Sequence, residues 1–315
     1  MVITVTLNPA LDRTLIIENF TLGTVNRASK ERFDIGGKGI NVSKVLKNLG
    51  IESKAIGFLG GMVKSVFLEE LDNRGIEHQF VEIGAQTRTN IKVVDNKNST
   101  NTDINEAGPA IKEEELQKFI EIYKENCKKE NIIVISGGIP KGISDDIYAR
   151  LIKIAKERGA YTILDAEGEL FRKAIMEKPY AIKPNNHELS LLFNETLEDE
   201  SKIIEKAIGI QKNGVSKILV SLGSKGAIYV TDDEIYSAKG LKVEVNSTVG
   251  AGDSMVAAIV YSLLNNLSNK DTLTFAQACG ASTVQLEGTE ACTLDEVKSF
   301  LEISERNVRR VDYGN

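Results

Sequence analysis

The 315-residue sequence predicts an α/β fold in which a mostly parallel sheet carries helices on both faces. From residue 132 onward, short apolar runs alternate regularly with longer helical patterns, which is typical of a parallel sheet. The run 132–135, Ile-Ile-Val-Ile, is apolar at every position, as expected of a strand buried on both faces. Polar residues follow these runs directly. Because ligands bind beyond the carboxyl ends of parallel strands, this rim is the expected place of the functional site.

Composition limits the kinds of partner and compartment. A net charge of −6 argues against nucleic acid as the main partner. No apolar run approaches the ~20 residues that a membrane span needs, so no membrane partner is expected. Cys127, Cys279 and Cys292 are too few and too scattered for a disulfide framework or a zinc site, which favours a reduced, cytoplasmic setting. Residues 1–5 lead directly into a strand and leave no room for a signal peptide.

The first half of the chain combines elements of this sheet with two β-rich segments. We expect strands at 2–7 and 54–59, and helices at 42–49, 63–73 and 113–128. Gly50 suits the position just after the first of these helices. The segments 13–33 and 87–105 contain strand-like runs without an adjacent helical pattern, which indicates a small sheet outside the main core.

The second half alternates strands and helices regularly. The expected strands are 132–135, 161–164, 180–183, 217–220 and 227–230, and the expected helices are 144–158, 170–177, 187–193, 202–213 and 255–264. The polar and small residues that follow strands are Asn8, Ser136, Asp165, Asn185, Ser221 and Gly223. All of them are expected on one rim of the sheet.

The stretch 248–254, Thr-Val-Gly-Ala-Gly-Asp-Ser, follows a short alternating apolar run at 241–245 and opens the apolar helix. Gly250, Ala251 and Gly252 leave bare backbone N–H groups at the helix start, where unpaired donors and the helix dipole attract an anion. Asp253 in the same turn repels an anion, unless it takes a proton from a nucleophile that attacks the anion. An ordinary helix cap is the alternative, and the local pattern alone favours the cap.

A second glycine run, Gly-Gly-Lys-Gly at 36–39, precedes the first helix. It is not a Walker A loop, since Gly39 stands where that loop needs Ser or Thr, and it does not match G-x-G-x-x-G. It is either a backbone cradle for an anion or a flexible connection. Lys38, together with Arg88 on the β-rich segment, is a candidate for binding a phosphate, although an isolated exposed arginine is usually only solvated.

Two further stretches carry candidate ligands for a nucleotide. Asn185 and Glu188 open a helix at i and i+3, so they either order Mg²⁺ and its waters or form a capping box. The loop 221–226, Ser-Leu-Gly-Ser-Lys-Gly, is either a tight hairpin or a small-residue loop along a nucleotide. His78 and His187 show no triad or metal-ligand spacing, which argues against histidine catalysis.

These stretches resemble the PfkB (ribokinase-like) carbohydrate kinases. Residues 36–42, Gly-Gly-Lys-Gly-Ile-Asn-Val, resemble the first signature of that family, and residues 247–254 resemble the second. The resemblance extends from Thr-Leu-Asn-Pro-Ala-Leu-Asp at 6–12 to Leu-Glu-Gly-Thr at 286–289. It implies a single ribokinase-like domain over 1–315, a three-layer α/β/α sandwich.

The resemblance also implies a small β-sheet lid, formed by about 12–34 and 87–106, through which a homodimer would form. Carried over residue by residue, it makes Asp253 the catalytic base and Gly250, Ala251 and Gly252 the anion hole. The residues that it assigns to a phosphosugar are Asp12, Gly37, Lys38, Asn41, Arg88 and Ser136. Those that it assigns to ATP are Lys183, Asn185, Ser221, Gly223, Ser224, Gly226, Gly252 and Gly288. Asn185 and Glu188 would order Mg²⁺ through water.

Within the family, the resemblance is to the branch that acts on sugar phosphates. Residues 87–92, Thr-Arg-Thr-Asn-Ile-Lys, and 102–106, Thr-Asp-Ile-Asn-Glu, are most similar to the 1-phosphofructokinases. This implies ATP-dependent phosphorylation of fructose 1-phosphate to fructose 1,6-bisphosphate, with tagatose 6-phosphate and fructose 6-phosphate as alternative substrates. A non-catalytic sugar-phosphate sensor is the distant alternative, but such a protein would be expected to lose the base.

Two features limit what the resemblance assigns. The sequence reads Ser136-Gly137-Gly138 where relatives often read Ser-Gly-Ser, which keeps Ser136 and removes a second hydroxyl. Residues 286–289, which include Gly288, are candidates both for contact with adenine and for a monovalent ion. The cofactors implied are therefore ATP and Mg²⁺, with K⁺ left open.

Overall fold

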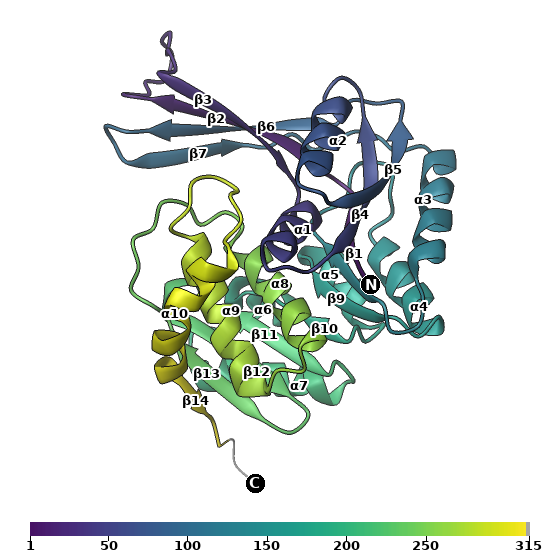
Figure 1. The fold of residues 1–315 in the computed structure, drawn as a ribbon, viewed down its shortest axis with the longest axis vertical. Helices are drawn as coiled ribbons and strands as arrows, with labels where there is room; N and C mark the ends of the chain where they lie inside the picture. Colours follow the sequence, from purple (N-terminus) through teal and green to yellow (C-terminus); the bar gives the residue numbers. More distant parts are fainter. Residues whose placement is uncertain (313–315) are drawn as a thin grey trace.

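The computed structural model describes residues 1–312 and contains two sheets (Figure 1). Within these residues the larger sheet has ten strands. In spatial order they are β14 (Val308–Arg310), β13 (Ile235–Lys239), β12 (Gly226–Thr231), β11 (Lys217–Ser221), β10 (Ala181–Ile182), β9 (Tyr161–Asp165), β8 (Ile132–Ser136), β1 (Val2–Thr6), β4 (Ser53–Gly60) and β5 (Glu77–Ile83). The strands from β11 to β5 pair in parallel, whereas β11 to β14 pair antiparallel. The predicted mostly parallel sheet is therefore confirmed.

Helices cover both faces of the large sheet, as the sequence predicted. One face packs against α3 (Glu113–Asn126), α4 (Ile147–Glu157), α5 (Gly168–Ile175), α6 (Asn186–Phe193) and α7 (Glu200–Lys212). The other packs against α1 (Lys38–Asn48), α2 (Lys64–Asn73), α8 (Ala251–Leu264), α9 (Asn269–Thr283) and α10 (Leu294–Asn307). The central strands are buried on both sides, so they need apolar residues at every position.

The second sheet has four strands, in the order β3 (Lys30–Gly36), β2 (Ala10–Ile17), β6 (Arg88–Asp95) and β7 (Thr100–Ile104). These strands come from the two β-rich segments of the sequence. In Figure 1 this sheet extends from beside α2 toward the upper left of the view. Strand β2 pairs antiparallel with β3 and parallel with β6, which places Asp12 opposite both Asp34 and Asn90.

Several boundaries differ from those predicted. Helix α1 begins at Lys38 rather than at residue 42, so Lys38 and Asn41 belong to the helix itself. Strand β10 is two residues long, and α4 begins at Ile147. The alternating run 241–245 is irregular chain rather than an element. None of the helices in residues 1–312 is long and apolar enough to span a membrane.

Candidate active site

The two glycine stretches meet where the first turns of α1 and α8 face each other. The Nδ2 of Asn41 on α1 donates to the Oδ2 of Asp253 on α8 at 2.8 Å. The exposed fractions of these residues are 8% and 5%. The fold thus brings together two candidate residues that are 212 positions apart in the chain.

The carboxyl group of Asp253 has an unusually high proton affinity. Burial raises its pKa to about 6 from the usual 3.8, and the nearby negative charge of Asp165 acts in the same direction. The charges of Lys38 and Lys183 and the hydrogen bond from Asn41 oppose this rise. The N-cap of α8 is Gly250, which has no side chain, and the carboxylate of Asp253 accepts from Asn41. The geometry therefore does not give Asp253 the role of an N-cap.

The start of α8 presents free backbone donors beside this carboxylate. Gly250 has φ 82°, a left-handed conformation that glycine adopts without strain. Ser254 N–H makes the first helical hydrogen bond, to Gly250 O, so the N–H groups of residues 251–253 have no helical partner. A Cβ on Gly252 would lie 3.3 Å from Lys183 Nζ, which brings an ammonium group close to these amides. Together they form a positive site suited to an anion.

Asp165, at the end of β9, links two of the candidate lysines. Its Oδ1 lies 3.4 Å from Lys38 Nζ and 3.5 Å from Lys183 Nζ. Burial acts to raise the pKa of Asp165, but the charges of Lys183 and Lys38 outweigh it and the pKa lies below its usual value. Burial likewise opposes the charge of Lys38, but the carboxylates of Asp165, Asp253 and Glu188 hold the pKa of Lys38 above its usual range.

From the sequence alone, Asp165 is recognisable only as a polar residue after a strand, and the resemblance does not assign it to the site. Its contacts with the buried Lys183 and with the partly exposed Lys38 make it a further candidate. The position after a buried strand was the available signal.

Asn185 and Glu188 form the capping box that the sequence allowed. Glu188 N–H donates to Asn185 Oδ1 and Asn185 N–H donates to Glu188 Oε2, each at 2.8 Å. Neither of these two hydrogen bonds uses Glu188 Oε1. Burial raises the pKa of Glu188, and the charge of Lys183 opposes that rise. Glu188 therefore caps the helix with one carboxylate oxygen and can bind a ligand with the other.

The polar side chains of the second sheet line a cavity of about 210 Å³. Its residues are Asp12, Thr14, Asp34, Asn90, Ile91, Lys92, Asp103, Asn105, Val249, Gly288 and Thr289. Asn90 Nδ2 donates to Asp12 Oδ1 at 2.8 Å. Burial raises the pKa of Asp12, against the hydrogen bond from Asn90 and the charges of Lys44 and Arg88. Val249 belongs to the stretch that leads into α8, so the cavity adjoins the anion site.

Arg88 and Gly37 flank the rim of the large sheet near this cavity. Arg88 donates to Asn8 O and to Glu106 O, both at 3.0 Å, so its guanidinium is held by backbone carbonyls rather than by a carboxylate. Gly37 has φ 118°, and a Cβ there would lie 2.6 Å from Thr6 Cγ2. The close approach of α1 to β1 therefore requires glycine at this position.

Several buried polar atoms around the site have no protein partner. A buried polar atom without a partner costs about 1–3 kcal/mol, so a group of them indicates a place for a polar ligand. Those on or next to candidate site residues include Asn8 Oδ1, Asn41 Oδ1, Arg88 Nε, Asn90 Oδ1, Ser136 Oγ, Asp165 Oδ2 and Thr289 Oγ1.

The remaining candidates lie in the loop 221–226 and at Gly288. Ser221 pairs with Asn185 in a β-bridge, which connects the loop 221–226 to the capping box. Gly223 and Ser224 form a 3₁₀ turn, and Gly226 begins β12. Gly288 accepts from Ser247 Oγ at 3.1 Å. It also lies against the Arg32 side chain of the second sheet, where a Cβ would clash.

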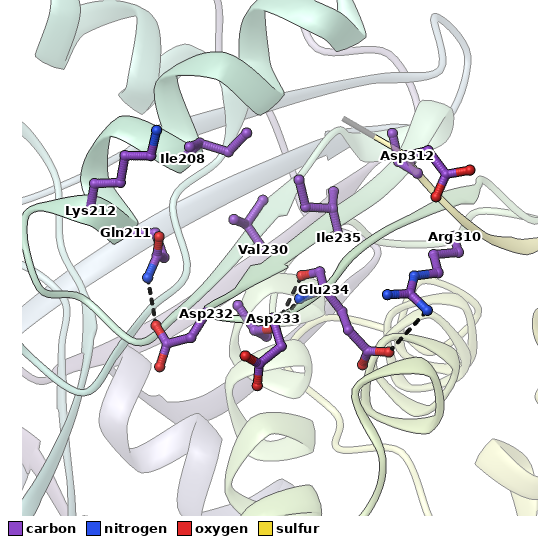
Figure 2. Close-up of a pocket in the computed structure, with 12 residues that line it drawn as sticks. Ile208, Gln211, Lys212, Val230, Asp232, Asp233, Glu234, Ile235, Arg310 and Asp312 are labelled. Atoms are coloured by element: carbon purple, nitrogen blue, oxygen red, sulfur yellow. Dashed lines mark hydrogen bonds and ion pairs between the residues drawn. The ribbon is translucent and has the colours of Figure 1, made fainter. Parts of the chain in front are cut away.

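A cavity of about 780 Å³ lies away from all of these residues (Figure 2). It is lined by α7, the turn between β12 and β13, and the residues around Arg310. Thr231 at the end of β12 pairs with Lys217 at the start of β11, so this cavity lies at the opposite end of the strand from Ser221. Its polar groups bind one another, as in the bond from Gln211 Nε2 to Asp232 Oδ1. It holds none of the candidate catalytic residues.

The family description "pfkB family carbohydrate kinase" matches residues 5–296. The chain belongs to the pfkB family of carbohydrate kinases. A 1-phosphofructokinase of Borreliella burgdorferi is 36% identical over 302 residues, or 96% of each chain. A tagatose-6-phosphate kinase of Staphylococcus epidermidis is 34% identical and covers 97% of this chain and 100% of its own. The structure of the phosphofructokinase-2 of Escherichia coli in complex with potassium superposes with a TM-score of 0.92, which confirms the predicted ribokinase-like fold. That structure has 30% identity and covers 97% of this chain and 99% of its own.

Proposed function

We propose that this pfkB kinase is a 1-phosphofructokinase, which transfers the γ-phosphoryl group of ATP to O6 of fructose 1-phosphate. The observation that carries the chemistry is the buried Asp253 carboxyl, which lies beside the free amides at the start of α8 and is oriented by Asn41. The family match and the 1-phosphofructokinase relatives at 32–36% identity support the choice of reaction.

In the proposed reaction Asp253 is the general base. With a pKa of about 6 the carboxyl is ionised at neutral pH and still basic enough to accept the proton of the sugar hydroxyl. As O6 forms its bond to the γ-phosphorus, the bond from that phosphorus to the bridging oxygen of ADP breaks, and ADP leaves. The products are fructose 1,6-bisphosphate, ADP and the proton held by Asp253.

The protein would contribute mainly position and charge, which is what phosphoryl transfer requires. The N–H groups of residues 251–253 would receive the oxygens of the transferred group, with Lys183 beside them. Asp12, Asn90 and Asn41 offer acceptors and donors for the sugar hydroxyls. Lys38 and Arg88 would meet the phosphate that the sugar already carries, together with Gly37 and the unpartnered hydroxyl of Ser136.

The residues beside the anion site fit Mg²⁺. Glu188 Oε1 is not used by the capping box, and the buried Asp165 Oδ2 has no protein partner. Carboxylate and amide oxygens are the ligands that Mg²⁺ prefers, usually with several waters retained. Glu188 and Asn185 would hold the ion through water, and the ion would neutralise the phosphate charges of ATP. Ser221, Gly223, Ser224 and Gly226 would line the nucleotide from the neighbouring loop.

The Gly288 segment is the candidate for a monovalent ion. Backbone N–H groups of Asn246 and Ser247 both donate to Val284 O, which brings the stretch before α8 against the segment after α9. Thr289 Oγ1 is buried without a partner in the same segment. The E. coli relative solved with potassium supports K⁺ as the ion. Turnover in KCl and in NaCl at equal ionic strength tests this assignment.

A homodimer through the second sheet is the proposed assembly. Phe33 and Ile104 on that sheet are 51% and 54% exposed, and Leu22 and Val25 in the β2–β3 connection are 85% and 79% exposed. Large apolar side chains that are left uncovered on one element favour a protein partner. Sedimentation of the wild-type chain against a Phe33→Lys/Ile104→Lys variant tests this interface.

The tagatose-6-phosphate kinase relative favours a second candidate substrate. The deciding experiment is a coupled ADP-release assay on fructose 1-phosphate, tagatose 6-phosphate and fructose 6-phosphate in parallel. We expect the highest kcat/KM with fructose 1-phosphate. A higher value with either 6-phosphate would reassign the substrate, and no ADP release with any sugar would favour a non-catalytic sensor.

A further inference from the structure

A buried lysine outside the candidate site lies at the root of the second sheet. Lys44 is on α1, one turn after Asn41, and is 4% exposed. Its Nζ donates to Ile35 O, near the end of β3, where the second sheet joins the large one. The next residues along the chain are Gly36 and Gly37, which lead into α1. The hydrogen bond from Lys44 therefore connects α1, the helix that carries Asn41, to β3 of the second sheet.

Charged groups from three other elements face Lys44. Asp34 of β3, Asp12 of β2 and Glu70 of α2 attract its ammonium, and Arg74 at the end of α2 repels it. Within residues 1–312 none of these carboxylates lies within 4.0 Å of Lys44 Nζ, so the attraction acts over a distance. Lys44 also lines a cavity of about 280 Å³ between the root of the sheet and α2.

Asp34, which lines the same cavity as Lys44, also pairs with Arg32 of the second sheet. Arg32 Nε binds Asp34 Oδ2 at 2.8 Å. Arg32 Nη1 also lies 3.4 Å from Glu287 and 3.6 Å from Glu290, in the segment after α9. The second sheet is thus attached to α1 through Lys44 and to the segment after α9 through Arg32. Asp34 and Thr289 line both the cavity that contains Asp12 and the cavity beside Lys44.

We propose that Lys44 is a positioning residue for the phosphosugar: it fixes the root of the second sheet so that an ionised Asp12 is held at the sugar cavity. This inference rests on the proposed function. Lys44 does not touch the sugar, and it acts through Ile35 and Asp12. Holding a binding group in place before the substrate arrives lowers the cost of ordering it on binding, so loss of Lys44 weakens binding of the sugar.

The charge of Lys44 gives this role a pH signature. Burial, assisted by Arg74, lowers the pKa of Lys44 to about 8 from the usual 10.5, although Asp34, Asp12 and Glu70 oppose the fall. The ammonium is therefore present at neutral pH and is lost as the pH rises through about 8. A neutral amine still donates to Ile35 O but no longer attracts Asp12 and Asp34. Binding of the sugar should weaken over the same pH range.

The test measures KM for the phosphosugar, KM for ATP and kcat between pH 6.5 and 9.5. Lys44→Met removes the charge, and Lys44→Arg keeps it at every pH, with the neighbouring cavity available for the larger head group. Lys47→Met is the matched control, because Lys47 lies on the same helix but pairs with Glu52 and donates to Gly75 O.

We expect Lys44→Met to raise KM for the sugar about tenfold at pH 7.5, while KM for ATP changes by less than about twofold; tenfold corresponds to about 1.4 kcal/mol. The wild-type KM for the sugar should rise above pH 8 toward the value of Lys44→Met. That of Lys44→Arg should stay low throughout, and Lys47→Met should follow the wild type.

The proposal is overturned if Lys44→Arg keeps the alkaline rise, if Lys44→Met leaves KM for the sugar unchanged, or if KM for ATP rises equally. Should Lys44→Met fail to fold, the pH profile of Lys44→Arg decides alone. If the wild-type enzyme turns over the sugar and the Lys44 variants have the same KM for it, this inference is rejected but the proposed function is not. Absence of wild-type turnover with all three sugars rejects both.

Discussion

Asn41 Nδ2 lies 2.8 Å from Asp253 Oδ2, in a contact that is closed off from solvent. The amide fixes one carboxylate oxygen and leaves the other oxygen free of this bond. A carboxylate that is buried, oriented and raised in pKa is what a general base for a hydroxyl requires. The same contact joins α1, which begins at the first glycine run, to α8, which begins at the second.

Replacement of the carboxylate should abolish most of the turnover. We expect Asp253→Asn to lower kcat about 10³-fold, because general base catalysis is usually worth about 10²–10⁴-fold. Calorimetric binding of ATP and of the sugar should change little. Asp271→Asn is a matched control, since Asp271 is also an acidic residue in the first turn of a helix, α9, but lies on the surface. Wild-type turnover in Asp253→Asn would reject the base assignment.

The pH dependence of kcat should report the same group. Asp253 accepts a proton only when ionised, so kcat should fall below about pH 6 and then drop about tenfold for each further pH unit. The hydrogen bond from Asn41 lowers this pKa, so Asn41→Ala should move the midpoint to higher pH. Rates at saturating substrates between pH 5 and 8 provide the measurement. A midpoint near pH 4, or one that Asn41→Ala leaves in place, contradicts the prediction.

Asp253 should also lower the stability of the fold. Its folded pKa of about 6 exceeds the usual 3.8, so ionisation of the buried group destabilises the folded state by about 3 kcal/mol at neutral pH. Asp253→Asn should therefore raise the free energy of unfolding at pH 7.5 by about 1–3 kcal/mol. The gain should disappear as the pH falls from about 6 to below 4, where the wild-type group is protonated in both states. Urea unfolding at pH 4 and 7.5 measures it.

Asp165 should behave in the opposite way. Its pKa lies below the usual value, so its ionised form stabilises the folded state above about pH 4, and this stability is lost as the pH falls through the folded pKa. Asp165→Asn leaves the buried Lys183 without its carboxylate partner, and breaking such a buried pair costs about 3–5 kcal/mol. The contact with Lys38 adds less, because the Lys38 side chain is 37% exposed and solvent screens its charge. The same urea experiment at pH 7.5 should show a loss. Equal signs for the two variants would contradict the electrostatic account.

Strands and helices with a strong period could be predicted from the sequence, and weakly patterned ones could not. The central strands, such as β8, are continuous apolar runs and were located within a residue or two. Strand β5 reads Glu-His-Gln-Phe-Val-Glu-Ile and lies at the edge of the sheet, where polar side chains are tolerated and the apolar signal is diluted. The run 241–245 alternates without pairing, because alternation alone supplies no partner strand.

Single residues of the candidate site could be predicted from their local sequence. The contacts between these residues could not, because the fold brings distant parts of the chain together. The glycine runs at 36–39 and 250–252 could be recognised as preceding helices, although α1 and α8 begin about four residues earlier than the apolar pattern indicates. The contact between Asn41 and Asp253, and the bridge of Asp165 to two lysines, join residues that no local pattern relates. The pKa of Asp253 likewise depends on burial, which the sequence does not reveal.

Glu188→Gln separates the two roles that the sequence left open for this residue. Glutamine keeps a capping box, so the cap to Asn185 and the stability of α6 should be retained within about 0.5 kcal/mol. It removes the negative charge, so a Mg²⁺ ion held through water should bind more weakly. We expect the Mg²⁺ concentration for half-maximal rate to rise about tenfold, while the urea midpoint stays fixed. If Glu188 only caps the helix, neither quantity should change. A fall in stability with an unchanged Mg²⁺ requirement would likewise reject the magnesium role.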